Sequence, residues 1–147
     1  MSFIKNLRYH IGTVWDGESG AEVNLREGYA LKLDMPAAFG GLGRHPCPNE
    51  LFFSAIGSCL LMMFLYFEKR FNLHLQGLRV LVDGNVEMIG PEGYRITGIR
   101  ITVHIETIKS DRGKAEKCAE LMMEYCPITR TLEKVIPIEV SVKIQTP

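Results

Sequence analysis

The run from Leu51 to Phe67 most constrains the fold, because it holds 17 residues without a single charge. That length is the lower limit for a membrane-spanning helix, but Ser54, Gly57 and Ser58 interrupt the run and the chain has no second one. We therefore predict a buried helix from about Pro48 to Arg70, and no membrane partner. A helix that is apolar on nearly every face needs cover on every face, and one small sheet covers only one face. We expect a second copy of the chain to supply the missing cover.

The rest of the chain alternates apolar and polar residues as β-strands do, and two further segments are helical. Strands and helices are segregated rather than alternating in a doubly wound series, which indicates the α+β class. A length of 147 residues fits one domain, over residues 1–147. The expected strands are Phe3–Trp15, Ala21–Leu25, Tyr29–Met35, Leu78–Met88, Tyr94–Ile108 and Ile138–Ile144, and the other expected helices are Lys114–Tyr125 and Pro127–Val135. A loop rich in Gly and Pro spans residues 36–48.

Charge and the N-terminus limit the cellular setting. Lys plus Arg equals Asp plus Glu at 17 each, so no net positive field favours nucleic acid or an anionic membrane. The first eight residues lack the apolar segment and the cleavage site of a signal peptide, so we expect a cytoplasmic protein. Thiols in that compartment stay reduced unless they are catalytic, which gives the cysteines added weight.

Two of the four cysteines lie in unusual settings. On a helix, Cys59 shares its face with residues three, four and seven positions away, which here are mostly apolar. Pro127 cannot continue the helix before it but suits the first position of a new one, so Cys126 is expected at a helix N-terminus, where a thiolate is favoured. The alternative is that both residues are small buried hydrophobes, which is common for free cysteines. Cys118 is expected to be a bystander.

The spacing of the cysteines argues against a metal. Cys47, Cys59, Cys118 and Cys126 are separated by 12, 59 and 8 positions, without the close pairs of a zinc site. The chain also lacks a nucleophile elbow, a phosphate loop and a dinucleotide fingerprint. We therefore predict neither a metal nor a cofactor.

Four motifs together resemble one known family. They are Gly40-Gly41-Leu42-Gly43-Arg44, Pro48-Asn49-Glu50-Leu51-Phe52, Ala55-Ile56-Gly57-Ser58-Cys59 and Tyr125-Cys126-Pro127-Ile128-Thr129-Arg130-Thr131-Leu132. These motifs, and the order of elements over nearly the whole chain, are similar to the OsmC/Ohr family of osmotically inducible and organic hydroperoxide resistance proteins. The resemblance implies antiparallel sheets packed around a buried central helix that carries a cysteine. It also implies an intertwined homodimer with active sites at the subunit interface.

The resemblance further implies a thiol peroxidase that reduces organic hydroperoxides. In that chemistry Cys59 attacks the peroxide and becomes a sulfenic acid, Cys126 condenses with it to a disulfide, and an external dithiol reduces the disulfide. An apolar face beside Cys59 would favour hydroperoxides with a hydrocarbon tail. The residues expected to form this substrate-binding face are Phe52, Ile56, Met62 and Met63. Two alternatives stay open: a binding protein for a small apolar or thiol ligand, and a disulfide redox sensor.

Two positions depart from the peroxidase branches of the family. An acidic residue usually follows the motif proline there and orients an arginine, but this chain has Asn49, with the carboxylate one position later at Glu50. At about 100° per residue, Glu50 projects opposite Cys59, so it is either catalytic or a cap of the helix N-terminus. Arg44, in the loop before the helix, is the preferred candidate for stabilising the Cys59 thiolate, and a solvated loop charge is the alternative.

Overall fold

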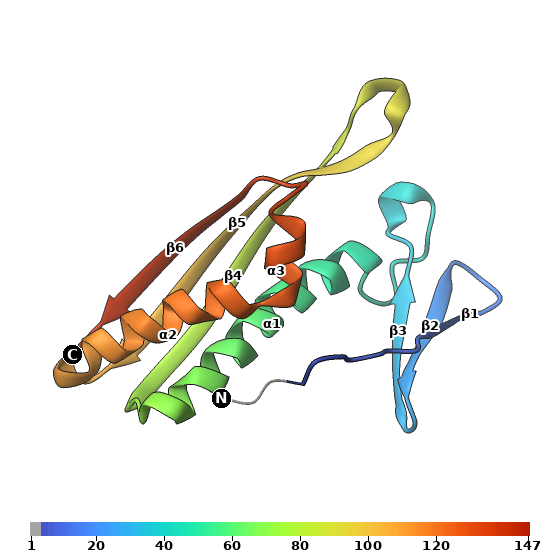
Figure 1. The fold of residues 1–147 in the computed structure, drawn as a ribbon. Helices are drawn as coiled ribbons and strands as arrows, with labels where there is room; N and C mark the ends of the chain where they lie inside the picture. Colours follow the sequence, from blue (N-terminus) through green and yellow to red (C-terminus); the bar gives the residue numbers. More distant parts are fainter. Residues whose placement is uncertain (1–3) are drawn as a thin grey trace. The chain divides into compact units, whose positions relative to one another are not determined.

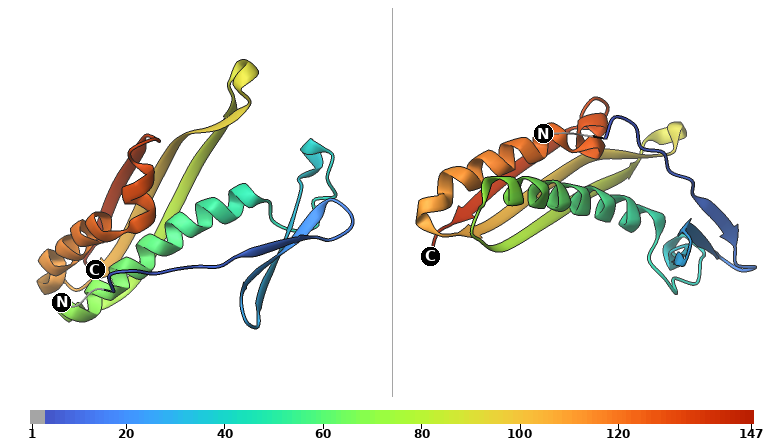
Figure 2. Two further views of the ribbon diagram at one scale, coloured as in Figure 1. Left: turned by 45° about the vertical axis from the view of Figure 1, so that its right-hand side comes forward. Right: turned by 60° about the horizontal axis from the view of Figure 1, so that its bottom comes forward.

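The computed structural model describes residues 4–147, which form two compact units (Figures 1 and 2). The N-terminal unit is Met1–Leu51 and the C-terminal unit is Phe52–Pro147. A single domain over residues 1–147 stays a prediction.

The N-terminal unit is a three-stranded antiparallel sheet in the order β1-β2-β3. The strands are β1 (Gly12–Trp15), β2 (Gly20–Arg26) and β3 (Tyr29–Asp34). The β2–β3 turn uses Gly28 at φ 79°, a conformation that suits glycine. The prediction of a first strand from Phe3 was wrong over residues 4–11, and Phe3 itself lies outside the described residues. Because Gly12 already pairs with Asn24, near the end of β2, a longer first strand would find almost no partner.

The C-terminal unit holds a second three-stranded sheet in the order β4-β5-β6. Its strands are β4 (Leu75–Met88), β5 (Tyr94–Thr107) and β6 (Ile138–Gln145). The β4–β5 hairpin is antiparallel as predicted, but β6 runs parallel to β5, from the pair Ile99↔Ile138 to Glu106↔Gln145. The prediction of wholly antiparallel sheets was therefore wrong. The two helices between β5 and β6 make a connection long enough to carry the chain back, which parallel pairing requires.

Three helices lie on one face of this second sheet (Figures 1 and 2). They are α1 (Pro48–Phe71), α2 (Arg112–Tyr125) and α3 (Pro127–Leu132). The bounds of α1 and α2 lie close to those predicted, whereas α3 ends before the predicted Val135. Pro137 disfavours a helical conformation in the residue before it, and the chain leaves α3 through a turn in which the Val135 N–H donates to Leu132 O at 2.9 Å.

The core of the C-terminal unit lies between α1, α2 and the sheet. Helix α1 contributes one fully buried stripe at helical spacing, and β5 contributes the alternate residues of one face. The buried core residues of α1 and β5 are Ile56, Leu60, Phe64, Phe67, Ile99, Ile101, Val103 and Ile105. Among the described residues, α1 is the one helix whose length and composition would allow it to cross a membrane, properties that core helices of soluble proteins share. Cover of its other faces by a second copy remains a prediction.

Candidate active site

The site is built on Cys59 and Cys126, whose sulfur atoms lie 3.4 Å apart. The Cys126 Sγ–H donates to Cys59 Sγ, and both cysteines are free thiols. Cys126 is fully buried and Cys59 is half-buried, so the pair is reached from solvent at Cys59. Two residues 67 positions apart thus form one dithiol.

The local sequence explains the position of Cys126. Pro127 has no N–H to continue α2, so Cys126 leaves the helical conformation at φ −68° and ψ 113° and links α2 to α3. Its own N–H still donates to Met122 O at 3.1 Å, which anchors it to the end of α2. The predicted place of Cys126 at the start of a helix is confirmed.

Burial raises the pKa of the Cys59 thiol to about 11. The neighbouring Cys126 adds to the rise through its hydrogen bond and its charge, whereas a hydrogen bond from the backbone of Ile128 lowers the pKa. Ile128 belongs to the first turn of α3, whose N–H groups have no partner within the helix. The start of α3 therefore acts on Cys59, a contact that sequence reasoning missed because only the fold brings α1 and α3 together.

The four residues predicted to form the substrate-binding face differ in exposure. Ile56 is fully buried in the core, while Phe52 and Met63 are half-buried and pack against it, as Cys59 does. Met62 is 65% exposed. The surroundings of Cys59 on α1 are apolar as predicted, and their role in binding a substrate stays a prediction.

Arg44 is anchored within the N-terminal unit by three carboxylates. Its Nε lies 2.7 Å from Asp34, one terminal nitrogen 2.5 Å from Asp16, and the other 3.5 Å from Glu18. The buried Asp34 also accepts hydrogen bonds from the Ser19 hydroxyl and from the backbone N–H of Arg44. The bond to Arg44 holds the pKa of Asp34 well below its usual range, and the bond to Asp34 raises the pKa of Arg44 further. Arg44 thus ties its loop to the sheet, and the predicted action on Cys59 stays a prediction.

Glu50 caps the N-terminus of α1. Its carboxylate accepts a hydrogen bond from the backbone N–H of Cys47 at 2.7 Å, while the Leu51 N–H donates to Cys47 O at 3.3 Å. A glutamate in the third position of a helix that reaches back to the N-cap residue is one half of a capping box. The cap interpretation is confirmed, and a catalytic role for Glu50 stays a prediction.

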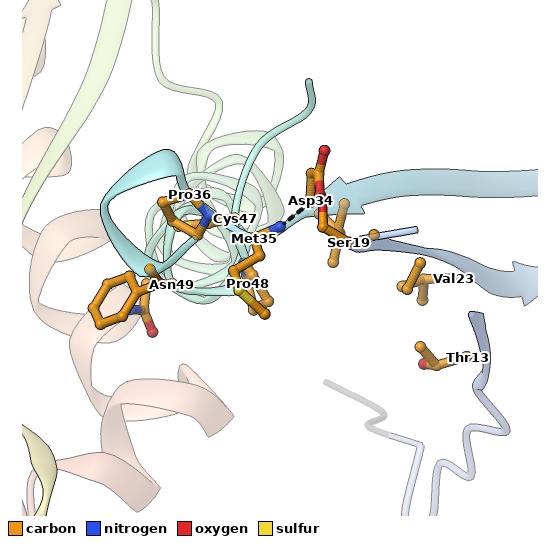
Figure 3. Close-up of a pocket in the computed structure, with 13 residues that line it drawn as sticks. Thr13, Ser19, Val23, Asp34, Met35, Pro36, Cys47, Pro48 and Asn49 are labelled. Carbon is orange, nitrogen blue, oxygen red and sulfur yellow. Dashed lines mark hydrogen bonds between the residues drawn. The ribbon is translucent and has the colours of Figure 1, made fainter. Parts of the chain in front are cut away.

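A cavity of about 790 Å³ lies in the N-terminal unit (Figure 3). Its volume is in the range of small-molecule pockets, and Cys47 is among its lining residues. Figure 3 shows Thr13 and Val23 of the strands on one side and Pro36, Cys47 and Pro48 on the other. The lining residues are Thr13, Ser19, Gly20, Ala21, Val23, Leu33, Asp34, Met35, Pro36, Phe39, Cys47, Pro48 and Asn49. Within residues 4–147, no group of three or more His, Cys, Asp or Glu side chains is placed to hold a metal ion.

Comparison with solved structures gives the fold. An OsmC-like protein from Mycoplasma pneumoniae matches with a TM-score of 0.81 and 18% identity, over 95% of this chain and 98% of that one. A protein from Legionella pneumophila, described as an organic hydroperoxide resistance protein OsmC, matches with a TM-score of 0.68 and 18% identity, over 93% and 97%. An organic hydroperoxide resistance protein from Elizabethkingia anophelis matches with a TM-score of 0.74 and 16% identity, over 98% and 100%.

Comparison with sequences gives the family. No curated protein matches this chain. The model of the family described as OsmC-like protein matches residues 41–141, which include both cysteines of the dithiol and most of the chain. The chain therefore belongs to the OsmC-like protein family.

Proposed function

We propose that this chain is a thiol-dependent peroxidase that reduces organic hydroperoxides in oxidative-stress defence. The observation that carries the proposal is the 3.4 Å contact between the free thiols of Cys59 and Cys126. Two relatives of the same fold are described as organic hydroperoxide resistance proteins, which supports this choice of substrate class. The protein is proposed to work as a homodimer in the cytoplasm, with an external dithiol as reductant.

The proposed cycle has three steps. The Cys59 thiolate attacks the O–O bond, which gives a sulfenic acid and releases the alcohol, whose oxygen takes up a proton. The Cys126 sulfur then displaces the sulfenic hydroxyl, so that a disulfide forms and water leaves. An external dithiol finally reduces this disulfide by exchange and is itself oxidised to a disulfide. The apolar side chains that pack with Cys59 favour a substrate with a hydrocarbon tail.

One observation favours a second candidate, a binding protein or redox sensor without turnover. The thiolate is the nucleophile, and a Cys59 pKa of about 11 leaves little thiolate at neutral pH. Turnover therefore needs a cation that comes close to Cys59, for which Arg44 is the proposed source. A binding protein or a slow disulfide sensor has no such need.

Hydroperoxide consumption with a dithiol reductant tests the proposal. The wild type should consume cumene hydroperoxide over many turnovers, and Cys59→Ser should abolish the reaction. Without the dithiol, Cys126→Ser should complete one turnover and leave a sulfenic acid that dimedone traps. With the dithiol, the matched variants Cys47→Ser and Cys118→Ser should keep the wild-type rate. Equal residual activity in the Cys59 and Cys126 variants would contradict the assigned roles. A wild type that forms the disulfide with diamide but consumes no hydroperoxide would favour the sensor.

A further inference from the structure

We propose that the Cys59–Cys126 dithiol is a chelating site for trivalent organoarsenicals, compounds in which arsenic carries one carbon substituent and binds two thiolates. The inference goes beyond the proposed function and does not rest on it, because it needs only the two reduced thiols in contact. Those thiols lie 3.4 Å apart, one fully buried and one half-buried.

The separation of the sulfurs selects among soft ions. Thiolates prefer soft ions as a class. A linear two-coordinate ion with metal–sulfur bonds of about 2.3 Å, the zinc–thiolate length, would hold the sulfurs about 4.6 Å apart. That distance is well beyond the observed 3.4 Å. Trivalent arsenic is pyramidal and holds two sulfurs on adjacent sites, in contact with each other, as they are here.

The number of protein side chains available to bind an ion narrows the choice of ion further. A structural zinc site needs four protein ligands, and the described part of the chain, residues 4–147, offers no cluster of three His, Cys, Asp or Glu side chains. Inorganic arsenite bound by two thiols would keep a hydroxyl group as its third substituent, which a third thiol would normally replace. An organoarsenical brings its own carbon as the third substituent, so two thiols suffice. Its organic group would lie at Cys59, the half-buried thiol, beside the apolar side chains that pack against the same core.

The reaction balances without an oxidant or a reductant. An arsine oxide R–As=O reacts with two thiols to form two As–S bonds, and its oxygen leaves as water with the two thiol protons. Arsenic stays trivalent and both sulfurs stay reduced. Because both thiol protons leave with the oxygen as water, the bound state needs no net loss of protons to solvent, so the raised pKa of Cys59 slows the reaction at neutral pH without weakening the adduct.

Phenylarsine oxide and intact-protein mass spectrometry test the inference at pH 7. The reduced wild type should gain one adduct per chain that resists excess glutathione, a monothiol, and is removed by 2,3-dimercaptopropanol, a dithiol. In Cys59→Ser and in Cys126→Ser, the glutathione concentration that removes half of the adduct should fall by at least about tenfold. The matched variants Cys47→Ser and Cys118→Ser should behave like the wild type.

A second measurement needs no variant and so does not depend on folding. Peptide mapping should use iodoacetamide under denaturing conditions in which the untreated reduced chain is alkylated at all four cysteines. After phenylarsine oxide it should find Cys59 and Cys126 both protected, and Cys47 and Cys118 alkylated. The inference fails if the fully reduced wild type forms no glutathione-resistant adduct, or if the protected pair includes Cys47 or Cys118. A wild type that forms the adduct but, when untreated, consumes no hydroperoxide would refute only the proposed function. A wild type that consumes hydroperoxide but forms no adduct would refute only this inference.

Discussion

At the scale of single residues, three neighbours of different kinds set the charge of Cys59. The apolar core and the Cys126 thiol both favour the neutral thiol, and the backbone of Ile128 favours the thiolate. The first two outweigh the third, since the pKa of Cys59 is raised to about 11. The reduced chain therefore holds Cys59 mostly protonated at neutral pH.

Alkylation of Cys59 by iodoacetamide should consequently rise about tenfold per pH unit up to a midpoint near pH 11, because only the thiolate reacts. Cys126→Ser should move this midpoint to lower pH, since the neighbouring thiol contributes to the raised pKa. Quantitative peptide mapping over a pH series measures both midpoints. Arg44→Ala is the informative companion variant. A higher midpoint in that variant would support its action on Cys59, and an unchanged one would leave Arg44 with its structural role alone.

The sequence alone predicted the positions of residues that depend on local geometry. The helix angle placed Glu50 away from Cys59 and made a cap one of its two predicted roles, and Pro127 located Cys126 at the junction of two helices. The partners of Arg44 were out of reach, because Asp34 and Asp16 lie 10 and 28 positions away in the sequence. Only the folded sheet and its loop bring these charges together.

At the scale of elements, α1 packs closely against β4 at a glycine of the strand. A methyl group at Gly84 of β4 would overlap ring carbons of Phe53 in α1, so the glycine allows the helix to approach the strand closely. The same helix carries Cys59, and its seating on the sheet therefore positions the dithiol.

Gly84→Ala should lower the free energy of unfolding by roughly 1–3 kcal/mol, the usual cost of overpacking. Gly98→Ala, on the neighbouring strand β5, is the matched control, because nothing lies within 4 Å of a Cβ there. Urea unfolding followed by circular dichroism compares the two. Adding Phe53→Leu to the first variant should recover part of the loss. Equal effects at Gly84 and Gly98 would mean that the contact with Phe53 does not limit the packing.

The pairing of the strands could not be predicted from the alternation of apolar and polar residues. Alternation predicted β5 and β6 within one or two residues, but not their parallel pairing, because alternation is the same in both directions. The long first strand failed for a related reason. An extended stretch becomes a strand only where another strand has residues free to pair with it. Gly12 of β1 already pairs with Asn24, close to the end of β2 at Arg26.

At the scale of the whole molecule, the N-terminal unit buries little apolar surface. Among its described residues only Val23 and Leu33 are buried apolar side chains, while Trp15 is 72% and Phe39 57% exposed. A three-stranded sheet needs a covered apolar face to be stable, and large apolar side chains that stay exposed favour cover by another surface.

We therefore expect a homodimer in solution. Sedimentation equilibrium at micromolar concentration should give about twice the chain mass of 16.6 kDa. A stable species at the mass of one chain would contradict this expectation.

The connection between β5 and β6 has a consequence for the lifetime of the protein. Cys126 lies in that connection and Cys59 lies 67 positions earlier, so a bond between them would close a ring that contains β4, β5 and α2. A ring of this size removes chain entropy from the unfolded state, a stabilisation of roughly 4 kcal/mol. Diamide-oxidised wild type should accordingly unfold at higher urea than reduced wild type, with no such difference in Cys126→Ser. Oxidant would then protect the chain from proteolysis, and the reductant that restores its thiols would also return it to the form that proteases degrade most readily.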